Sequence, residues 1–335
     1  MIKKVKYATA SNGDIIHIYT ITNKKGEYVS LLDYGASIHE FCVYDNKGKL
    51  CDIVLGCNKQ NVENSKIIGG VVGRVSNRIE NGKFNIDNKE YYLEKNNKEH
   101  FLHGAKDNYA TKMFKAKQLN NSIVFYLLDK DSVGFECDVD VVITYEFDDD
   151  SCLKSTYELT PKGDTLLNPS SHVFFNLNVN KTDARNHNLQ IFTDKIPCRN
   201  MNNIPKDGYE DCLDQFCFLE KRNILDVMNK NNIQSYDQFY DYNNLEMKEM
   251  AMLESENTGI KMTVKSDMPC LIFFLTKMKN DEIGKKDILY KNYSGLCLET
   301  SFVPNAINCN DYIKPIYRKG EKLVSKTEYH IERRI

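Results

Sequence analysis

The chain has 335 residues, of which 41% are hydrophobic and 27% are charged, and its formal net charge is −2. This composition is typical of a globular protein with a large core. Binding to a phosphate backbone needs a surplus of basic residues, so the near-neutral charge excludes nucleic acid as an expected partner. No apolar run is long enough to span a bilayer, and the first residues lack the apolar stretch of a signal peptide. We therefore expect a cytoplasmic protein with no membrane partner.

Eleven cysteines are scattered between Cys42 and Cys309. Their number is odd, no C-x-x-C pair occurs, and no histidine lies at ligand spacing from the closest pair, Cys212 and Cys217. A zinc finger and a disulfide framework both fit this pattern badly, so we expect buried free thiols. No trio of His, Asp or Glu has a recognisable ligand spacing either, and the sequence predicts no metal.

Alternation with a period of two runs along most of the chain and predicts half-buried strands. The clearest examples are residues 122–128, 139–147, 153–159 and 326–332. Turn residues separate such runs and suit hairpin connections at 12–13, 45–48, 87–88 and 257–259. Helical periodicity is scarce, and the best candidate is 215–229. Many short strands joined by hairpins favour one all-β domain, a sandwich or a barrel, over residues 1–335. We expect a monomer.

The sequence lacks the motifs of a nucleotide-binding site and of a serine hydrolase. Residues 68–74 are rich in glycine but lack the lysine of a P-loop and the spacing of a dinucleotide fingerprint. No G-x-S-x-G sequence occurs, so the nucleophile elbow of a serine hydrolase is absent from the sequence.

Residues 168–177 carry the first candidate for chemistry. If they form a strand, His172, Phe174 and Asn176 share one face. The other face is purely apolar, with Val173, Phe175 and Leu177. This pattern suits a strand with its back to the core and its front to a cleft. Taken alone, a histidine satisfied by a hydrogen bond inside the protein is the more frequent explanation.

Glu299 is the second candidate, because it interrupts the apolar run at 295–302. An unpaired carboxylate in such a strand is costly, so Glu299 should be either paired or used. A partly dry glutamate has a raised pKa, as a general base near neutral pH requires. A buried structural ion pair is the alternative for this residue.

Two further segments, 72–82 and 101–104, bring together side chains that can hydrogen-bond sugar hydroxyls. Asn77, Arg78 and His103 are the candidates there. Arginine is more often a solvated surface charge, so these segments say little by themselves.

Taken together, the segments resemble the galactose mutarotase (aldose 1-epimerase) family. That family shows G-R-x-x-N-R-I, L-H-G, N-H-x-Y-F-N-L, Y-D-H-N-F and L-E-T-Q in this order. The matching stretches here begin at Gly73, Leu102, Ser171, Tyr236 and Leu298, and the resemblance spans roughly residue 15 to the C-terminus.

The resemblance implies a large twisted antiparallel β-sandwich, the galactose mutarotase-like supersandwich, with a broad sugar cleft. It implies that His172 is the general acid, that Glu299 is the general base, and that His103 supports charge near the ring oxygen. The residues implied to bind the sugar are Asn77, Arg78, Asp237 and Phe174. No cofactor is implied, and the partner would be a small-molecule sugar.

Several positions depart from the family pattern. They are Ser171 for Asn, Phe174 for Tyr, Gln238 for His, Ile272 for Gln, Ser301 for Gln and Asn305 for Asp. None removes the proposed acid or base, but several remove hydrogen-bond partners for a sugar, which affects specificity or affinity.

Three functions follow from these observations. The first is an isomerase that interconverts the α and β anomers of free aldohexoses such as glucose and galactose. The second is a catalytically weak sugar-binding or sensor protein on the same scaffold. The third is an epimerase of a phosphorylated hexose, which would need basic residues such as Arg74 and Arg78 around the phosphate.

Overall fold

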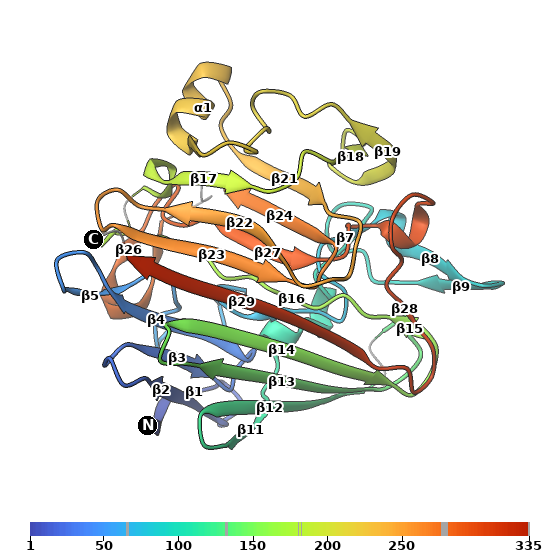
Figure 1. The fold of residues 1–335 in the computed structure, drawn as a ribbon. Helices are drawn as coiled ribbons and strands as arrows, with labels where there is room; N and C mark the ends of the chain where they lie inside the picture. Colours follow the sequence, from blue (N-terminus) through green and yellow to red (C-terminus); the bar gives the residue numbers. More distant parts are fainter. Residues whose placement is uncertain (65–66, 131–132, 180, 182, 276–280, 334–335) are drawn as a thin grey trace.

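Antiparallel strands build most of the computed structural model, which describes residues 1–64, 67–130, 133–179, 181, 183–275 and 281–333. The largest sheet crosses the front of the molecule in Figure 1. Its nine strands lie in the order β11 (Lys115–Gln118), β12 (Ser122–Asp129), β13 (Val139–Phe147), β14 (Cys152–Pro161), β29 (Leu323–Arg333), β23 (Ile260–Ser266), β22 (Lys248–Glu254), β17 (Asn188–Ile191) and β20 (Arg222–Asn223).

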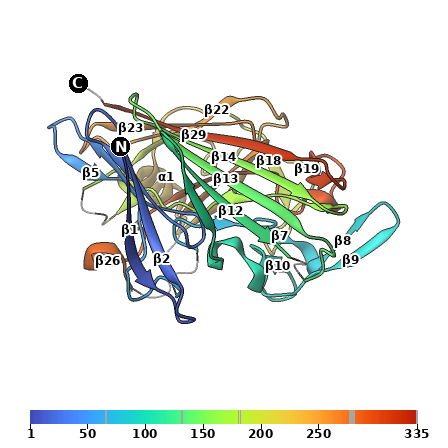
Figure 2. The ribbon, with the colours of Figure 1, turned by 90° about the horizontal axis from the view of Figure 1, so that it is seen from below.

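A second sheet covers the inner face of β12 and β13. It has five strands in sequence order, β1 (Ile2–Thr9), β2 (Ile15–Thr22), β3 (Tyr28–Leu32), β4 (Ser37–Tyr44) and β5 (Leu50–Asp52). Seen from below, β1 and β2 run at a steep angle to β12 and β13 (Figure 2). Aromatic rings join the two sheets, with Phe41 against Phe147 and Tyr19 against Phe125. Two sheets packed face to face in this way make a sandwich.

A third sheet extends the sandwich and holds part of the site. Its strands lie in the order β21 (Tyr236–Asp241), β24 (Cys270–Leu275) and β27 (Cys297–Ser301). One face of this sheet joins the same core as the two larger sheets, through Tyr236, Phe273 and Leu298. The other face carries the residues described in the next section.

Short paired strands and single turns of helix complete the chain. The pairs are β6 (Val71–Val72) with β16 (Ser170–Ser171), β7 (Arg78–Ile79) with β10 (Phe101–Leu102), β8 (Lys83–Ile86) with β9 (Lys89–Tyr92), β15 (Thr165–Leu166) with β28 (Ile316–Tyr317), β18 (Ile196–Arg199) with β19 (Pro205–Glu210), and β25 (Glu282–Ile283) with β26 (Leu289–Tyr290). The α-helix of the described residues is α1 (Ile224–Asn231). No helix among them is long and apolar enough to cross a membrane.

The all-β prediction is confirmed, and the alternation in the long strands is the reason. In β13 every second residue is at most 3% exposed, and these side chains fill the core: Val139, Val141, Ile143, Tyr145 and Phe147. The four predicted turns each connect neighbouring antiparallel strands, namely β1–β2, β4–β5, β8–β9 and β22–β23.

Two local predictions are wrong in part. The helix predicted over 215–229 begins only at Ile224, because Asn223 caps it by accepting the Asp226 N–H and the residues before it pair with β17. The predicted strand at 168–177 contains only β16 and isolated bridges at Asn168 and Phe175. The predicted alternation of its side chains is nevertheless correct, since Val173, Phe175 and Leu177 are buried in the core.

Candidate active site

Glu299 lies in the middle of β27, an edge strand of the three-stranded sheet, on the face opposite to the one that joins the core. The strand register places Asp237 beside Phe274 and Phe274 beside Cys297, and in the next row it places Ile272 beside Glu299. Directly paired residues point to the same face of a sheet. Asp237, Phe274 and Cys297 therefore share a face with Glu299, as the period-two analysis of β27 predicts.

His172 approaches this face from the segment that follows β16. Its backbone N–H donates to the carbonyl of Gly70, and its own carbonyl accepts from Gly69, so the peptide is fixed on both sides. The imidazole lies between Cys297 and Glu299. Its Nδ1 is 3.5 Å from the Cys297 Sγ, and its Nε2 is 3.7 Å from the Glu299 Oε1.

The two central side chains are almost completely buried, at 5% and 3% exposed for His172 and Glu299. The Glu299 Oε2 has no hydrogen-bond partner among the described residues. A buried carboxyl oxygen without a partner is costly and rare in folded proteins. The arrangement therefore leaves one buried oxygen of Glu299 without a partner among the described residues.

Burial changes the pKa of both groups because it penalises their charged forms. It lowers the pKa of His172 to about 4. It raises the pKa of Glu299 to about 8, with a further contribution from the negative charge of Asp237. Between these values the two groups together hold one proton, and the opposite shifts place it on Glu299.

His103 is held beside His172 by Asn77. The Asn77 backbone N–H donates to the His103 Nδ1 at 3.1 Å, and the backbone N–H of His103 donates to the Asn77 backbone carbonyl at 3.1 Å. Burial, together with the nearby His172 and Arg78, holds the pKa of His103 well below its usual range. Because Nδ1 accepts a hydrogen bond, the proton of this neutral ring lies on Nε2. His103 therefore presents a hydrogen-bond donor near His172, and the centroids of the two rings are 5.4 Å apart.

A close backbone approach makes this arrangement possible. Gly104 has a φ of +83°, and a Cβ at this position would lie 2.0 Å from the carbonyl oxygen of Gly73. Only glycine fits there. The sequence Leu-His-Gly therefore brings the His103 loop against the segment that carries Asn77.

Arg78 connects the first half of the chain to the three-stranded sheet. Its Nη1 lies 3.2 Å from the Asp237 Oδ2 and 3.4 Å from the Asn77 Oδ1, and its Nε donates to Asn97. The side chains of Arg78 and Asp237 remain 18% and 28% exposed. They are ordered by their partners and still accessible, as groups that bind sugar hydroxyls need to be.

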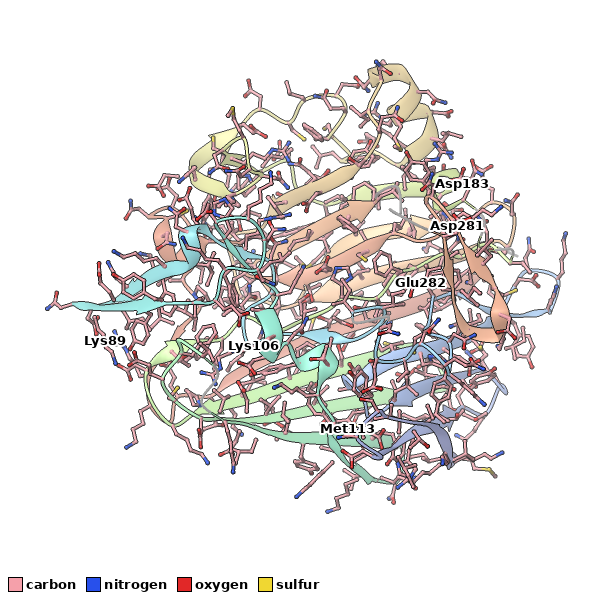
Figure 3. All side chains as sticks on the ribbon, turned by 180° about the vertical axis from the view of Figure 1, so that it is seen from behind. Lys89, Lys106, Met113, Asp183, Asp281 and Glu282 are labelled. Carbon is pink, nitrogen blue, oxygen red and sulfur yellow. The ribbon has the colours of Figure 1, made fainter. Side chains whose placement is uncertain are left out.

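Phenylalanine rings form the remaining wall. Phe174 and Phe274 lie with their ring centroids 5.0 and 6.1 Å from that of His172. The same two rings line a cavity of about 200 Å³, together with Leu55, Ile67, Ile68, Glu282, Ser294 and Gly295. Figure 3 shows the molecule from the side opposite to Figure 1, with Glu282 labelled. The structure thus gathers the other five predicted site residues around the buried pair of His172 and Glu299.

Comparison with known proteins identifies the family. The family model described as aldose 1-epimerase matches residues 17–330. The chain belongs to the aldose 1-epimerase family. It is 26% identical to the aldose 1-epimerase of Escherichia coli K12 over 335 residues, which cover 96% of this chain and 97% of that protein. It is 28% identical to the galactose mutarotase of Rattus norvegicus over 305 residues, with 88% of each chain covered.

Solved structures show the same fold. The GalM/aldose epimerase homologue from C. elegans has a TM-score of 0.88 at 24% identity, covering 94% of this chain and 98% of that one. The galactose 1-epimerase from Lactobacillus acidophilus NCFM has a TM-score of 0.83 at 21% identity, covering 99% of both. As a member of this family the chain is an isomerase that acts on a small-molecule sugar.

The departures from the family pattern differ in their positions relative to the pair. Gln238 follows Asp237 in β21, so it points to the opposite, core face and is 1% exposed. Ser301 is fully buried and donates to the carbonyl of Phe302. Phe174 and Ile272, in contrast, lie beside His172 and Glu299. Of these four residues, Phe174 and Ile272 are the direct neighbours of the pair.

Sequence reasoning missed Phe274 and Cys297 as neighbours of His172. Cys297 could have been found, because it shares the period-two face of Glu299 and lies two residues before it. Phe274 could not have been found, since its place depends on the register between β24 and β27.

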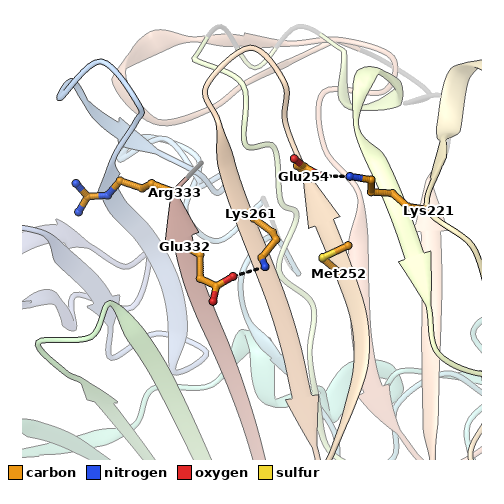
Figure 4. Close-up of a pocket in the computed structure, with 6 residues that line it drawn as sticks. All are labelled: Lys221, Met252, Glu254, Lys261, Glu332 and Arg333. Carbon is orange, nitrogen blue, oxygen red and sulfur yellow. Dashed lines mark hydrogen bonds and ion pairs between the residues drawn. The ribbon is translucent and has the colours of Figure 1, made fainter. Parts of the chain in front are cut away.

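Another hollow, of about 310 Å³, lies over β22, β23 and β29 and is shown in Figure 4. Its lysines are paired with its carboxylates: Lys221 with Glu254 at 2.7 Å, and Lys261 with Glu332. These groups already satisfy one another, and no residue of the acid–base pair lines this hollow. It is therefore a weaker candidate for the sugar site.

Proposed function

We propose that this chain interconverts the α and β anomers of free aldohexoses such as glucose and galactose, with His172 and Glu299 as the acid–base pair. The observation that carries the proposal is the buried pair itself. Its facing atoms are 3.7 Å apart, and one carboxyl oxygen has no partner among the described residues. Hydrogen-bonding groups from three distant parts of the chain surround it.

The reaction needs two proton transfers and no other chemistry. Glu299 removes the proton from O1 while His172 protonates O5, so the bond between C1 and O5 breaks and an aldehyde forms. Rotation about C1–C2 presents the other face of the aldehyde. Closure returns the proton of O5 through His172 and that of O1 through Glu299. A positioned acid and base contribute about 10²–10⁴-fold each.

The surroundings of the pair favour this relay. Ring opening converts charged His172 and Glu299 into neutral imidazole and carboxylic acid without changing their total number of protons. Burial favours the neutral forms, as the opposite pKa shifts of the two groups express. The proton transfer therefore removes two buried charges while the ring opens. In the free protein the shifted pKa values place the shared proton on Glu299, so the proposal requires this proton to move to His172 when the sugar binds.

The other residues position the sugar in this proposal. The Nε2–H of His103 donates toward the ring oxygen or its neighbouring hydroxyl, where negative charge develops as C1–O5 breaks. Arg78 and Asp237 hold hydroxyls as donor and acceptor, and Asn77 fixes the geometry of both Arg78 and His103. Phe174 packs against the apolar side of the sugar ring.

A free sugar is favoured over a phosphorylated one by the position of Arg74. Its side chain is fully buried and paired with Asp129 at 2.7 Å, so it is not available to a phosphate. Arg78 is accessible but already faces Asp237, whose charge would repel a phosphate.

Polarimetry on freshly dissolved α-glucose and α-galactose tests the proposal. We expect His172→Asn and Glu299→Gln each to reduce the catalysed rate by about 10²–10⁴-fold with an unchanged melting transition or a higher one. Glu328→Gln makes the same chemical change on the outer face of the large sheet and should leave the rate unchanged. Wild-type rates equal to the buffer blank would overturn the proposal. Calorimetric sugar binding without such rates would instead indicate a sugar sensor, and a preference for glucose 6-phosphate would indicate the phosphorylated substrate.

A further inference from the structure

A second cluster of possible metal ligands lies on the outer face of the nine-stranded sheet. Cys152 in β14 pairs directly with His330 in β29, and Glu328 precedes His330 by two residues on the same face. The His330 Nε2 lies 3.5 Å from the Cys152 Sγ and 2.7 Å from the Glu328 Oε2. One nitrogen, one sulfur and one oxygen therefore converge on a single region.

Hydrogen bonds within the cluster cannot satisfy all three side chains at once. Both the thiol and the carboxylate face the same ring nitrogen, which offers either one hydrogen or one lone pair. If Nε2 carries a hydrogen, it can point well at only one of the two neighbours. If Nε2 is unprotonated, it can accept from the thiol but then repels the carboxylate. A cation among the three atoms would satisfy all of them.

Two neighbouring lysines attract Glu328 without forming an ion pair with it among the described residues. The strand register places Lys154 and Lys265 on either side of Glu328. Each lysine is engaged with a carboxylate of its own, Lys154 with Asp148 at 3.1 Å and Lys265 with Glu249 at 3.0 Å. The close contact of the Glu328 carboxylate is therefore with His330.

The chemistry of the three ligands points to zinc. Thiolate, imidazole and carboxylate together suit Zn²⁺, which binds sulfur at about 2.3 Å and nitrogen at about 2.0–2.1 Å in tetrahedral geometry. The observed 3.5 Å between Nε2 and Sγ is the separation that two such ligands need. To reach ligand geometry, the carboxylate oxygen of Glu328 has to move away from the His330 Nε2 by less than about 1 Å, which its partly exposed side chain allows. Water can complete the coordination.

Solvent reaches the cluster from one side. The side chains of His330 and Glu328 are 35% and 26% exposed, whereas Cys152 is 1% exposed. An ion can therefore enter past the histidine and the glutamate and then contact the buried sulfur, which loses its proton on binding.

We propose that Cys152, Glu328 and His330 form a zinc site that fastens the C-terminal strand β29 to β14. The site lies on the outer face of a sheet whose inner face packs against the core. It is separate from the acid–base pair and does not depend on the proposed mutarotase activity. The sequence predicts no metal because Cys152 is 176 residues away from Glu328 along the chain. Only the fold brings the three ligands together.

A competing trio exists in the candidate active site. His172, Cys297 and Glu299 also offer ligand atoms within 4.8 Å of one another. Zinc bound there would block the acid–base pair. The two sites therefore differ in the cysteine they require and in their effect on catalysis.

Calorimetric titration of the chelator-treated full chain with ZnCl₂ tests the proposal, with Cys152→Ser and His330→Asn as variants and Cys297→Ser as the matched control. We expect one Zn²⁺ per chain, bound at least tenfold more weakly by the first two variants and equally well by the control, since even loss of an outer partner costs about 10–100-fold. We also expect Co²⁺ to show thiolate-to-metal absorption that Cys152→Ser abolishes. One equivalent of Zn²⁺ should raise the melting temperature and leave mutarotation unchanged.

Three results would overturn this assignment. The first is the absence of saturable Zn²⁺ binding to the wild-type chain. The second is binding that Cys297→Ser removes and that inhibits mutarotation, which would assign the ion to the active-site trio. The third is a Co²⁺ complex that keeps its thiolate absorption in Cys152→Ser. His330→Asn retains the cysteine, so the test remains decisive even if Cys152→Ser does not fold.

Discussion

The substitution Ile272→Gln offers a direct test of how the surroundings of Glu299 set its pKa. Ile272 is fully buried and lies directly opposite Glu299 across the β24–β27 ladder. Paired side chains on one face of a sheet have Cβ atoms about 4.5–5.5 Å apart. A glutamine at 272 can therefore donate its amide N–H to the carboxylate, whose Oε2 has no partner among the residues described.

The size of the expected change follows from the strength of that bond. A hydrogen bond to a charged group contributes about 1.5–3 kcal/mol, and one pKa unit corresponds to about 1.4 kcal/mol. The new bond favours the carboxylate, so the pKa of Glu299 should fall from about 8 to about 6–7. His172, whose pKa burial lowers to about 4, gains no new partner, so its pKa should stay the same.

The rate follows the fraction of the pair that holds one proton. In the wild type this state extends from about pH 4 to about pH 8, and activity falls at lower and at higher pH. Polarimetric kcat against pH should show the alkaline limb of Ile272→Gln about one to two pH units lower, with the acid limb unchanged. Ile272→Leu keeps the site apolar and should keep the alkaline limb in place. An unmoved limb in a folded Ile272→Gln protein would refute this account of Glu299.

Three further predictions concern the same site. Arg78→Lys should raise KM about tenfold with little change in kcat, because a lysine has one nitrogen and cannot contact Asn97 and Asp237 together, as Nε and Nη1 of the arginine do. His103→Ala should lower kcat about 10²-fold without moving either limb of the pH profile, since it removes a donor and no titrating group. Glu299→Gln should raise the melting temperature increasingly above about pH 6. The raised pKa of Glu299 makes wild-type stability fall as the pH rises from 4.5 to about 8, by up to about 5 kcal/mol, and the amide lacks this cost. Melting curves that run parallel for the two proteins between about pH 6 and about pH 9 would contradict this last prediction.

Much of the fold is predictable because alternation and turns are local. The strand β13 and the turn at 45–48 illustrate this, since each is specified by residues that are neighbours in sequence. The helix α1 was predicted nine residues too early because the capping role of Asn223 outweighs weak periodicity before it. The position of Gln238 could also have been predicted, since Asp237 on the site face requires its neighbour to face the core.

The composition of the site depends on contacts that no local pattern contains. Alternation places His172 and Glu299 on the less apolar sides of their segments, but it says nothing of the distance between them. Their approach depends on the backbone of His172 pairing with Gly69 and Gly70 and on the bridge from Phe175 to Leu296. Ile272 acquires its importance from register alone, because a shift of one residue in β24 would turn it into the core.

A comparison inside the molecule separates the catalytic interpretation of Glu299 from the structural one. Arg74 and Asp129 show what a satisfied buried ion pair looks like here: the guanidinium binds the carboxylate at 2.7 Å, and Tyr109 donates to the same carboxylate. Glu299 has no such partners, since its nearest basic atom is 3.7 Å away and its second oxygen is unpartnered among the described residues. A pair retained for stability would be expected to resemble the first, because an incompletely bonded buried carboxylate is destabilising. The incomplete hydrogen bonding of Glu299 therefore favours a catalytic role over a structural one.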